Sequence, residues 1–376
     1  SRLIGTATLN ITSDPITANT NLSALGSGLT LQFGGDSSVV VNGATLSVRQ
    51  DQVSGYTISG TGTVSAVGTN SADTFDASGI SATINFTSFS GNDSISIAPS
   101  TLGSGDSIDG GSNTDTLIFS AATTSIVDAS FTNVTNTEVL QLSAGTNTIS
   151  LGSEAENSGA GITTVTGSTG DDTLNLVYGT TGLTFNAGSG SDTLSYNADS
   201  ATQSITLTSV SSGTASGSVS NGGTDTFTGL EAIVGGSGSS DLITSTIAAE
   251  TLLVTGVNAG TIDGFAFNGV ESVNLGLGND SATINSGGSL SGNLNLGDGN
   301  NTLTFNSGAG SVGSVTSGTG TDSVTISGGS ISGALALGTG SDSLSYASYS
   351  SAVSATLSGT NALSSTTAIS GGVSGV

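Results

Sequence analysis

The chain repeats one short unit at a nearly constant spacing. The unit is a turn rich in Gly, Ser and Asn, followed by Asp, then Ser or Thr, then an apolar residue, as in Asp73-Thr74-Phe75 and Asp93-Ser94-Ile95. These two copies lie 20 residues apart, and the steps from Asp280 through Asn301 and Asp322 to Asp342 are 21, 21 and 20 residues. One repeat of this size cannot bury its own apolar edge, so the pattern predicts coils that stack on their neighbours.

Each period contains two or three short stretches that alternate apolar and polar residues. Leu174-Asn175-Leu176, Leu303-Thr304-Phe305 and Val324-Thr325-Ile326 are examples, and glycine turns separate them. Strands this short do not suit a β-sandwich, and no segment has a 3.6-residue period. The sequence therefore predicts an all-β parallel β-solenoid with coils of about 20–21 residues and almost no helix. The phase breaks near residues 225–241, which we interpret as loop insertions.

The regularity of the repeat divides the chain into three predicted parts. Residues 1–70 are less regular and are predicted to form an N-terminal β segment, either a cap or an assembly region. Residues 71–358 are predicted to form the solenoid, and residues 359–376, which lack an Asp turn, a C-terminal cap or tail.

Composition excludes most catalytic chemistry. The 376 residues contain no His, Cys, Met or Trp, and the only two cationic side chains are Arg2 and Arg49. No Ser-His-Asp or Cys-His arrangement and no Cys/His zinc site can form. We therefore expect that the protein is not an enzyme. A polysaccharide-degrading solenoid enzyme is disfavoured because only acids remain in the repeat region.

The net charge of −25 restricts the possible partners. Nucleic-acid binding depends on Lys and Arg that face phosphates, so it is excluded, as is adsorption to an anionic membrane. No run of 18 apolar residues is present, so no membrane insertion is expected. An acidic surface without bases attracts small cations that take oxygen ligands.

The turns Gly188-Ser189-Gly190-Ser191-Asp192-Thr193-Leu194 and Gly338-Thr339-Gly340-Ser341-Asp342-Ser343-Leu344 resemble a known repeat. They are similar to the glycine- and aspartate-rich nonapeptide of haemolysin-type (RTX) calcium-binding proteins, and residues 229–243 resemble the sequence that often precedes such repeats. The resemblance implies calcium held between successive turns by Asp carboxylates and turn carbonyls. It also implies export to the outside of a bacterial cell, where surface-layer proteins and adhesins of this family act.

The candidate metal ligands are the aspartates of the repeated turns: Asp73, Asp93, Asp115, Asp172, Asp192, Asp241, Asp280, Asp322 and Asp342. The alternative is that each Asp bonds the N–H groups of its own turn while its charge stays solvated. Glu138, Glu231 and Glu271 lie in similar contexts and are interpreted either as carbohydrate contacts or as solvated strand ends.

The function that these features favour is a secreted structural protein at the bacterial cell surface. It is expected to self-associate into an extracellular array, such as an S-layer, sheath or filament, with calcium as a possible stabiliser and cell-surface glycans as possible partners. The alternative is a stalk, adhesin or binding module of a larger cell-surface protein.

Overall fold

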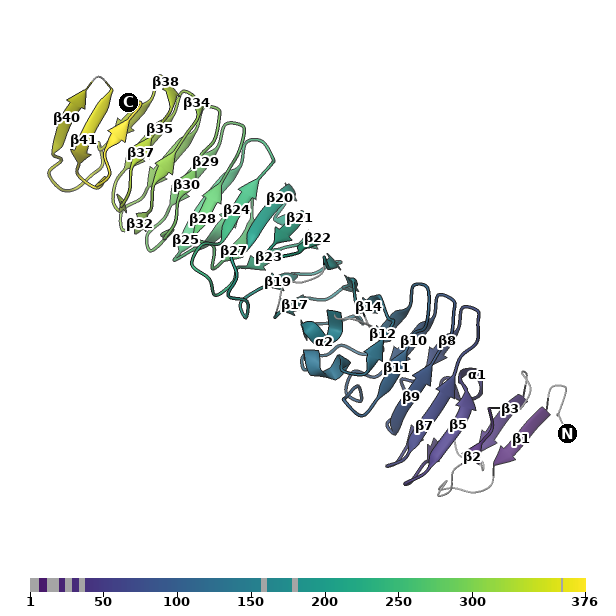
Figure 1. Ribbon diagram of the computed structural model, residues 1–376. Helices are drawn as coiled ribbons and strands as arrows, with labels where there is room; N and C mark the ends of the chain where they lie inside the picture. Colours follow the sequence, from purple (N-terminus) through teal and green to yellow (C-terminus); the bar gives the residue numbers. More distant parts are fainter. Residues whose placement is uncertain are drawn as a thin grey trace. The chain divides into compact units, whose positions relative to one another are not determined.

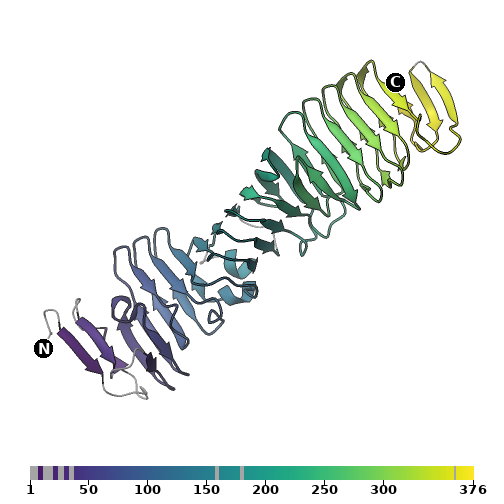
Figure 2. The ribbon, with the colours of Figure 1, turned by 180° about the vertical axis from the view of Figure 1, so that it is seen from behind.

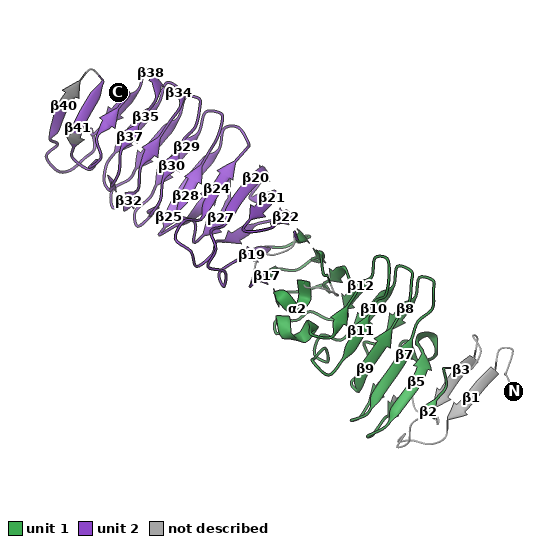
Figure 3. Cartoon of the chain, in the orientation of Figure 1, with its two compact units in different colours: residues 1–174, 183–190 green, residues 175–182, 191–376 purple. Residues whose placement is uncertain are grey.

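The computed structural model describes residues 7–11, 20–23, 29–33, 38–156, 161–177, 182–359 and 361–376. It contains 47% strand and 4% helix and forms a parallel β-solenoid of about 14 turns, which confirms the predicted fold class. The contacts divide the chain into unit 1, residues 1–174 and 183–190, and unit 2, residues 175–182 and 191–376 (Figure 3). Each unit is described by itself below.

Unit 1 has two walls of parallel strands (Figure 1). One wall contains β8 (Thr74–Asp76), β10 (Ser94–Ile97), β12 (Thr116–Phe119), β14 (Val139–Gln141), β16 (Thr164–Thr166) and β18 (Thr184–Asn186). The other contains β2 (Thr20–Asn21), β5 (Thr45–Arg49), β7 (Thr63–Val67), β9 (Thr83–Thr87), β11 (Ser107–Asp109) and β13 (Val134–Thr135). Two smaller pairs are β1 (Ala7–Ile11) with β3 (Leu29–Phe33), and β4 (Ser38–Val40) with β6 (Thr57–Ser59). β15 (Asn147–Leu151) belongs to a further wall, of which β17 (Asp172–Leu176) is also a strand.

Unit 2 continues the same design with shorter strands. Its first wall contains β20 (Ser204–Ser211), β24 (Leu242–Ser245), β28 (Ser272–Asn274), β30 (Leu294–Asn295), β33 (Val315–Thr316), β37 (Leu335–Ala336) and β42 (Val373–Ser374). Its second wall contains β19 (Thr193–Ser195), β23 (Ala232–Val234), β27 (Phe265–Asn268), β26 (Ala259–Ile262), β25 (Thr251–Gly256), β29 (Ser281–Ile284), β31 (Thr302–Phe305), β35 (Ser323–Ile326) and β39 (Ser343–Ser345). Two short pairs close the corners: β32 (Ser311–Val312) with β36 (Ser330–Ile331), and β34 (Thr319–Gly320) with β38 (Thr339–Gly340).

Antiparallel hairpins interrupt the parallel walls of unit 2 and explain the phase breaks in the sequence. β20, β21 (Thr214–Ser220) and β22 (Thr224–Leu230) form one such excursion, and β25, β26 and β27 form another. A third hairpin, β40 (Ala355–Gly359) with β41 (Ala362–Thr366), lies near the C-terminus, and Figure 2 shows it from behind. The expected insertions are therefore β-hairpins rather than irregular loops.

The core is made by the inward residues of the alternating strands. In the register of β31 and β35, Leu303 pairs with Val324 and Phe305 with Ile326, and all four side chains are fully buried. Equal residues thus stack on each other from coil to coil, which removes from water an apolar edge that one coil leaves open. The helical segments are short: α1 (Gln50–Val53), α2 (Ser153–Glu156) and the 3-10 turn Asp128–Phe131. No helix in the described ranges is long and apolar enough to cross a membrane.

Solenoid pairing begins before the predicted boundary at residue 70. β5 and β7 pair in parallel with each other, and β7 continues the wall into β9 in a five-residue register. At the other end, β42 lies inside the predicted C-terminal tail yet pairs in parallel with β37, so it belongs to the wall.

The turns need glycine where two coils approach each other closely. A Cβ at Gly299, whose φ is +122°, would lie 1.6 Å from the carbonyl oxygen of Gly278 in the preceding coil. Gly287 has a similarly left-handed backbone, with φ of +79°, but a Cβ there meets no atom within 4 Å.

We therefore expect Gly299→Ala to destabilise the protein more than Gly287→Ala. Both changes put Ala into left-handed backbone, which costs roughly 1–2 kcal/mol. Only Gly299→Ala also forces two coils apart, and overpacking of this kind adds about 1–3 kcal/mol. Urea denaturation of both variants measures the difference, and equal losses of stability would show that coil contact at this turn is not close.

Candidate functional site: a ladder of buried acids

The predicted aspartates form a ladder of hydrogen bonds that runs from coil to coil. In unit 2 the residues just before β25, β29, β31, β35 and β39 are Glu250, Asp280, Asn301, Asp322 and Asp342, and we call this set the acid ladder. At each step the backbone N–H of one member donates to the side-chain Oδ1 of the next member, at 2.8–2.9 Å. Each carboxylate or amide therefore ties its coil to the coil before it.

Unit 1 contains the same arrangement. The N–H of Asp73 donates to Asp93 Oδ1 and the N–H of Asp93 to Asp115 Oδ1, both at 2.7 Å. The N–H of Asp115 then donates to Glu138 Oε2 at 2.8 Å, and Gln50 Nε2 donates to Asp73 Oδ1 at 2.9 Å. Asp93 and Asp115 are 1% and 0% exposed, so their charges are not solvated as the turn interpretation expected.

The remaining predicted aspartates make the same bond in shorter runs. Asp172 Oδ1 accepts from the side-chain Nδ2 of Asn147 at 2.7 Å, and Asp241 Oδ1 accepts from the N–H of Gln203 at 2.6 Å. The N–H of Asp192 donates to Glu231 Oε2 at 2.9 Å. The structure thus brings neighbouring members together in pairs along the coils and does not gather them into one cluster.

Three glutamates that were interpreted as glycan contacts or solvated strand ends belong to this bonding pattern. Glu138, Glu231 and Glu271 each accept the N–H of the aspartate one coil earlier, at 2.8–2.9 Å. Sequence reasoning missed this role because their steps from the preceding Asp are 23, 39 and 30 residues rather than 20 or 21. The signal that identifies them is local: an acid directly before a short strand.

The two asparagines of the pattern show what the second side-chain atom meets. Asn301 Nδ2 donates to the carbonyl oxygens of Gly297 and Gly299, and Asn147 Nδ2 donates to those of Ser143 and Gly145. In both cases the amide reaches the carbonyls four and two residues earlier in its own turn. A donor is therefore the group that these corners accommodate.

Several aspartates place an oxygen where the asparagines place an amide. Oδ2 of Asp93, Asp115 and Asp322 is buried and accepts no hydrogen bond from the described residues. In contrast, Asp73 Oδ2 accepts from the N–H of Thr69, and Asp172 Oδ2 from the N–H of Ser168 at 2.8 Å. The ladder thus contains both corners that satisfy the second oxygen and corners that leave it without a donor.

Burial shifts the acid–base equilibrium of several members. Burial raises the pKa of Asp115 to about 6, against the lowering effect of the N–H of Asp93. It also raises the pKa of Glu250 to about 8, with a further contribution from the side-chain hydrogen bond to Asp280. Burial raises the pKa values of Asp280 and Asp241 as well. Glu250 and Asp280 are 1% exposed, so this pair shares a proton in a site that excludes water.

The donor set does not fit the calcium site that the resemblance implies. Calcium takes six to eight oxygen ligands, yet within the described ranges no three His, Cys, Asp or Glu side chains converge. Each ladder acid also commits one oxygen to a backbone N–H of the neighbouring coil. Calcium binding by the nine aspartates stays a prediction, and no step of the argument below depends on it.

Comparisons with known proteins add no relative. No protein family, no curated protein and no solved structure matches the chain. The resemblance to RTX repeats therefore stays a prediction that rests on the turn sequences alone.

We expect Asp322→Asn and Asp322→Ala to have opposite effects on stability. Alanine removes the acceptor of the Asn301 N–H, and a buried unsatisfied donor costs about 1–3 kcal/mol. Asparagine keeps Oδ1 and supplies the donor that Asn301 uses one coil earlier, so Asp322→Asn should equal or exceed the wild-type stability. Chemical denaturation measures both variants, and an Asp322→Asn loss as large as that of Asp322→Ala would contradict the ladder.

The raised pKa values predict a protein that is more stable in acid. For Glu250 the folded pKa of about 8 exceeds the ordinary 4.5, so its protonated form adds stability fully below about pH 4.5, and this is lost as pH rises through 8. For Asp115 the same loss runs from about 3.8 to 6. Thermal melting temperatures should therefore fall between pH 5 and pH 9.

A matched pair of variants separates this effect from the general repulsion of a chain with net charge −25. Glu250→Gln should flatten the melting curve between pH 6 and 8, whereas Glu154→Gln, which removes an equal but exposed charge, should not. Parallel pH profiles for both variants would show that Glu250 titrates as an ordinary surface acid.

Proposed function

We propose that this protein is a structural subunit of an extracellular array, such as an S-layer, sheath or filament at a bacterial cell surface. The observation that carries the proposal is the use of the acid side chains. In a chain whose only possible catalytic groups are carboxylates and hydroxyls, the repeat acids are buried and bound to the backbone of the adjacent coil. The residues that chemistry would need are used to hold one coil to the next.

The surface of the coils supports the same proposal. Polar side chains form rows that repeat at the coil spacing, as in Asn274, Asn295 and Thr316, where each residue donates to the one before it at 3.0–3.1 Å. Such rows offer a flat, uncharged, regularly spaced surface. A surface of this kind suits lateral packing of identical subunits, because charged groups are depleted from the centres of interfaces.

The second candidate is a stalk or binding module of a larger cell-surface protein. The hairpin β25–β26 favours it locally, since the hairpin leaves Val257 70% exposed and Leu277, in a nearby turn, is 65% exposed. Isolated exposed apolar residues are common on soluble proteins, so this observation is weaker than the ladder. In this case the chain would remain monomeric and bind a ligand, such as a cell-surface glycan.

Electron microscopy and sedimentation of the purified chain test the proposal. We expect ordered assemblies that form more readily as NaCl rises, because salt screens the repulsion between subunits of net charge −25. Calcium compared with EGTA at matched ionic strength then reports any specific cation requirement. A monodisperse monomer under all of these conditions would contradict an array protein and favour the stalk or binding module.

A further inference from the structure

The last coil of unit 2 is covered on one wall and open on the other. On the first wall, β42 pairs with β37 and β41 pairs with β42, so added strands follow the last full coil. On the second wall, β39 pairs with β35 and has no further strand among the described residues. An uncovered strand edge of this kind is a template for pairing with another chain.

The acid ladder also ends at this edge without its next member. The N–H groups of Glu250, Asp280, Asn301 and Asp322 each donate to a side chain one coil onward, but no such acceptor meets the N–H of Asp342 in the described structure. Oδ2 of Asp342 is buried and also lacks a hydrogen-bond partner there. The edge therefore asks for one more carboxylate or amide before one more strand.

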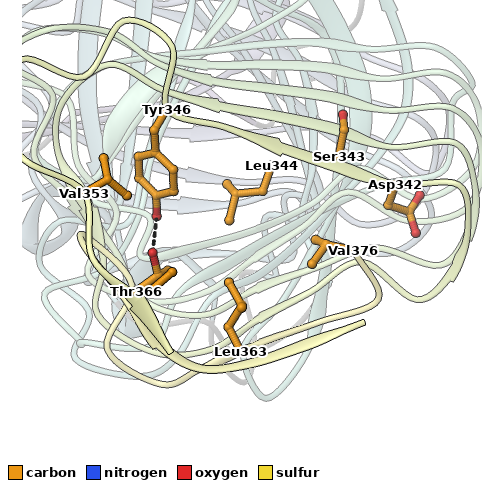
Figure 4. A pocket seen from close by; sticks show the side chains of 9 residues that line it. Asp342, Ser343, Leu344, Tyr346, Val353, Leu363, Thr366 and Val376 are labelled. Carbon is orange, nitrogen blue, oxygen red and sulfur yellow. Dashed lines mark hydrogen bonds between the residues drawn. The ribbon is translucent and has the colours of Figure 1, made fainter. Parts of the chain in front are cut away.

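The apolar interior is open at the same place. Leu344 stands where Leu303 and Val324 are 0% exposed in earlier coils, yet it is only half-buried. A hollow of about 410 Å³ lies beside it, and Figure 4 shows Tyr346, Val353 and Leu363 around this space. Val353 is 45% exposed, so the hollow has the size and apolar lining to receive the side chains of another coil.

Symmetry decides how a second copy can fill this position. Two copies that meet through β39 by a twofold axis would place their strands antiparallel, so the Asp342 N–H could not reach an acid of the partner as it does within the chain. A head-to-tail contact keeps all strands parallel. The first strand of unit 1, β1, pairs in parallel with β3, and in the described residues it has no other partner strand.

Charge favours the same arrangement. Arg2 and Arg49, the only cationic side chains of the chain, lie within its first 49 residues, whereas the open edge of unit 2 carries Asp342. A head-to-tail contact brings unlike charges toward each other, and a tail-to-tail contact brings like charges together.

We infer that β39 and the hollow beside Leu344 are the docking surface for the N-terminal edge of a second copy of this chain, with β1 added in parallel to β39. This inference rests on the proposed array function and names the contact that would propagate the array along the coil axis. A head-to-tail contact does not close on itself, so it produces filaments rather than dimers.

Cysteine crosslinking tests the contact, because the chain contains no Cys of its own. Ser345→Cys in β39 is mixed with Thr8→Cys or Asn10→Cys in β1, under mild oxidation. Neighbouring strands lie about 4.8 Å apart, within the Cα separation that a disulfide accepts. We expect covalent heterodimers from the mixtures, and few from either variant alone or from Ser341→Cys in the exposed turn.

A charged edge provides the second arm. Leu344→Lys places an unpaired charge in the apolar hollow and should reduce crosslinking and assembly at least about tenfold, since burying such a charge is costly. Ser341→Lys makes the same charge change in the exposed turn and should leave both unchanged. Circular dichroism confirms that both variants keep the fold.

The outcomes separate the inference from the proposed function. If the wild type assembles but Leu344→Lys assembles equally and no heterodimer forms, the array stands and this contact is overturned. If the wild type stays monomeric but specific heterodimers form at high concentration, the contact stands and the array proposal fails. If neither occurs, both are overturned.

Discussion

The structure depends on how each coil satisfies the backbone N–H that precedes its strand. At this corner the chain leaves a glycine turn and enters the wall, so the N–H points toward the next coil before regular strand pairing begins. A side-chain oxygen supplied by that next coil accepts it, as Asp322 does for Asn301 and Asp93 for Asp73. Because buried backbone donors are costly when left unpaired, this bond fixes which residue stands above which and thereby sets the register of the stack.

The same solution carries a cost that asparagine avoids. Stacked carboxylates lie about 5 Å apart, where like charges repel by roughly 1 kcal/mol in water and several times more in a drier site. Asn301 interrupts the unit 2 ladder and uses its amide to bond Gly297 and Gly299, while Glu250 and Asp280 relieve the repulsion by sharing a proton. The neutral members show that the acceptor matters to the stack and the charge does not.

The regular part of this fold could be predicted from the sequence, because alternation and spacing report strand pairing directly. The steps of 20 and 21 residues between Asp280 and Asp342 correspond to one parallel register each. The burial of the acids could not be predicted, since an Asp before a strand reads the same whether it faces water or the next coil. The hairpin β20–β21–β22 hid the partnership of Asp192 with Glu231 in the same way, by separating in sequence two residues that are adjacent in the stack.

A ladder that links each coil to the next has no natural end inside the chain. The first wall of unit 2 is ended by a change of direction, since β41 turns antiparallel to β42, and antiparallel strands cannot pass on the parallel register. The second wall has no such device at β39, and there the acceptor, the strand and the apolar filling are all missing from the next position. The interaction that holds coils together within the chain is thus also the one that this end presents to a partner, so internal stability and assembly would follow from the same bond.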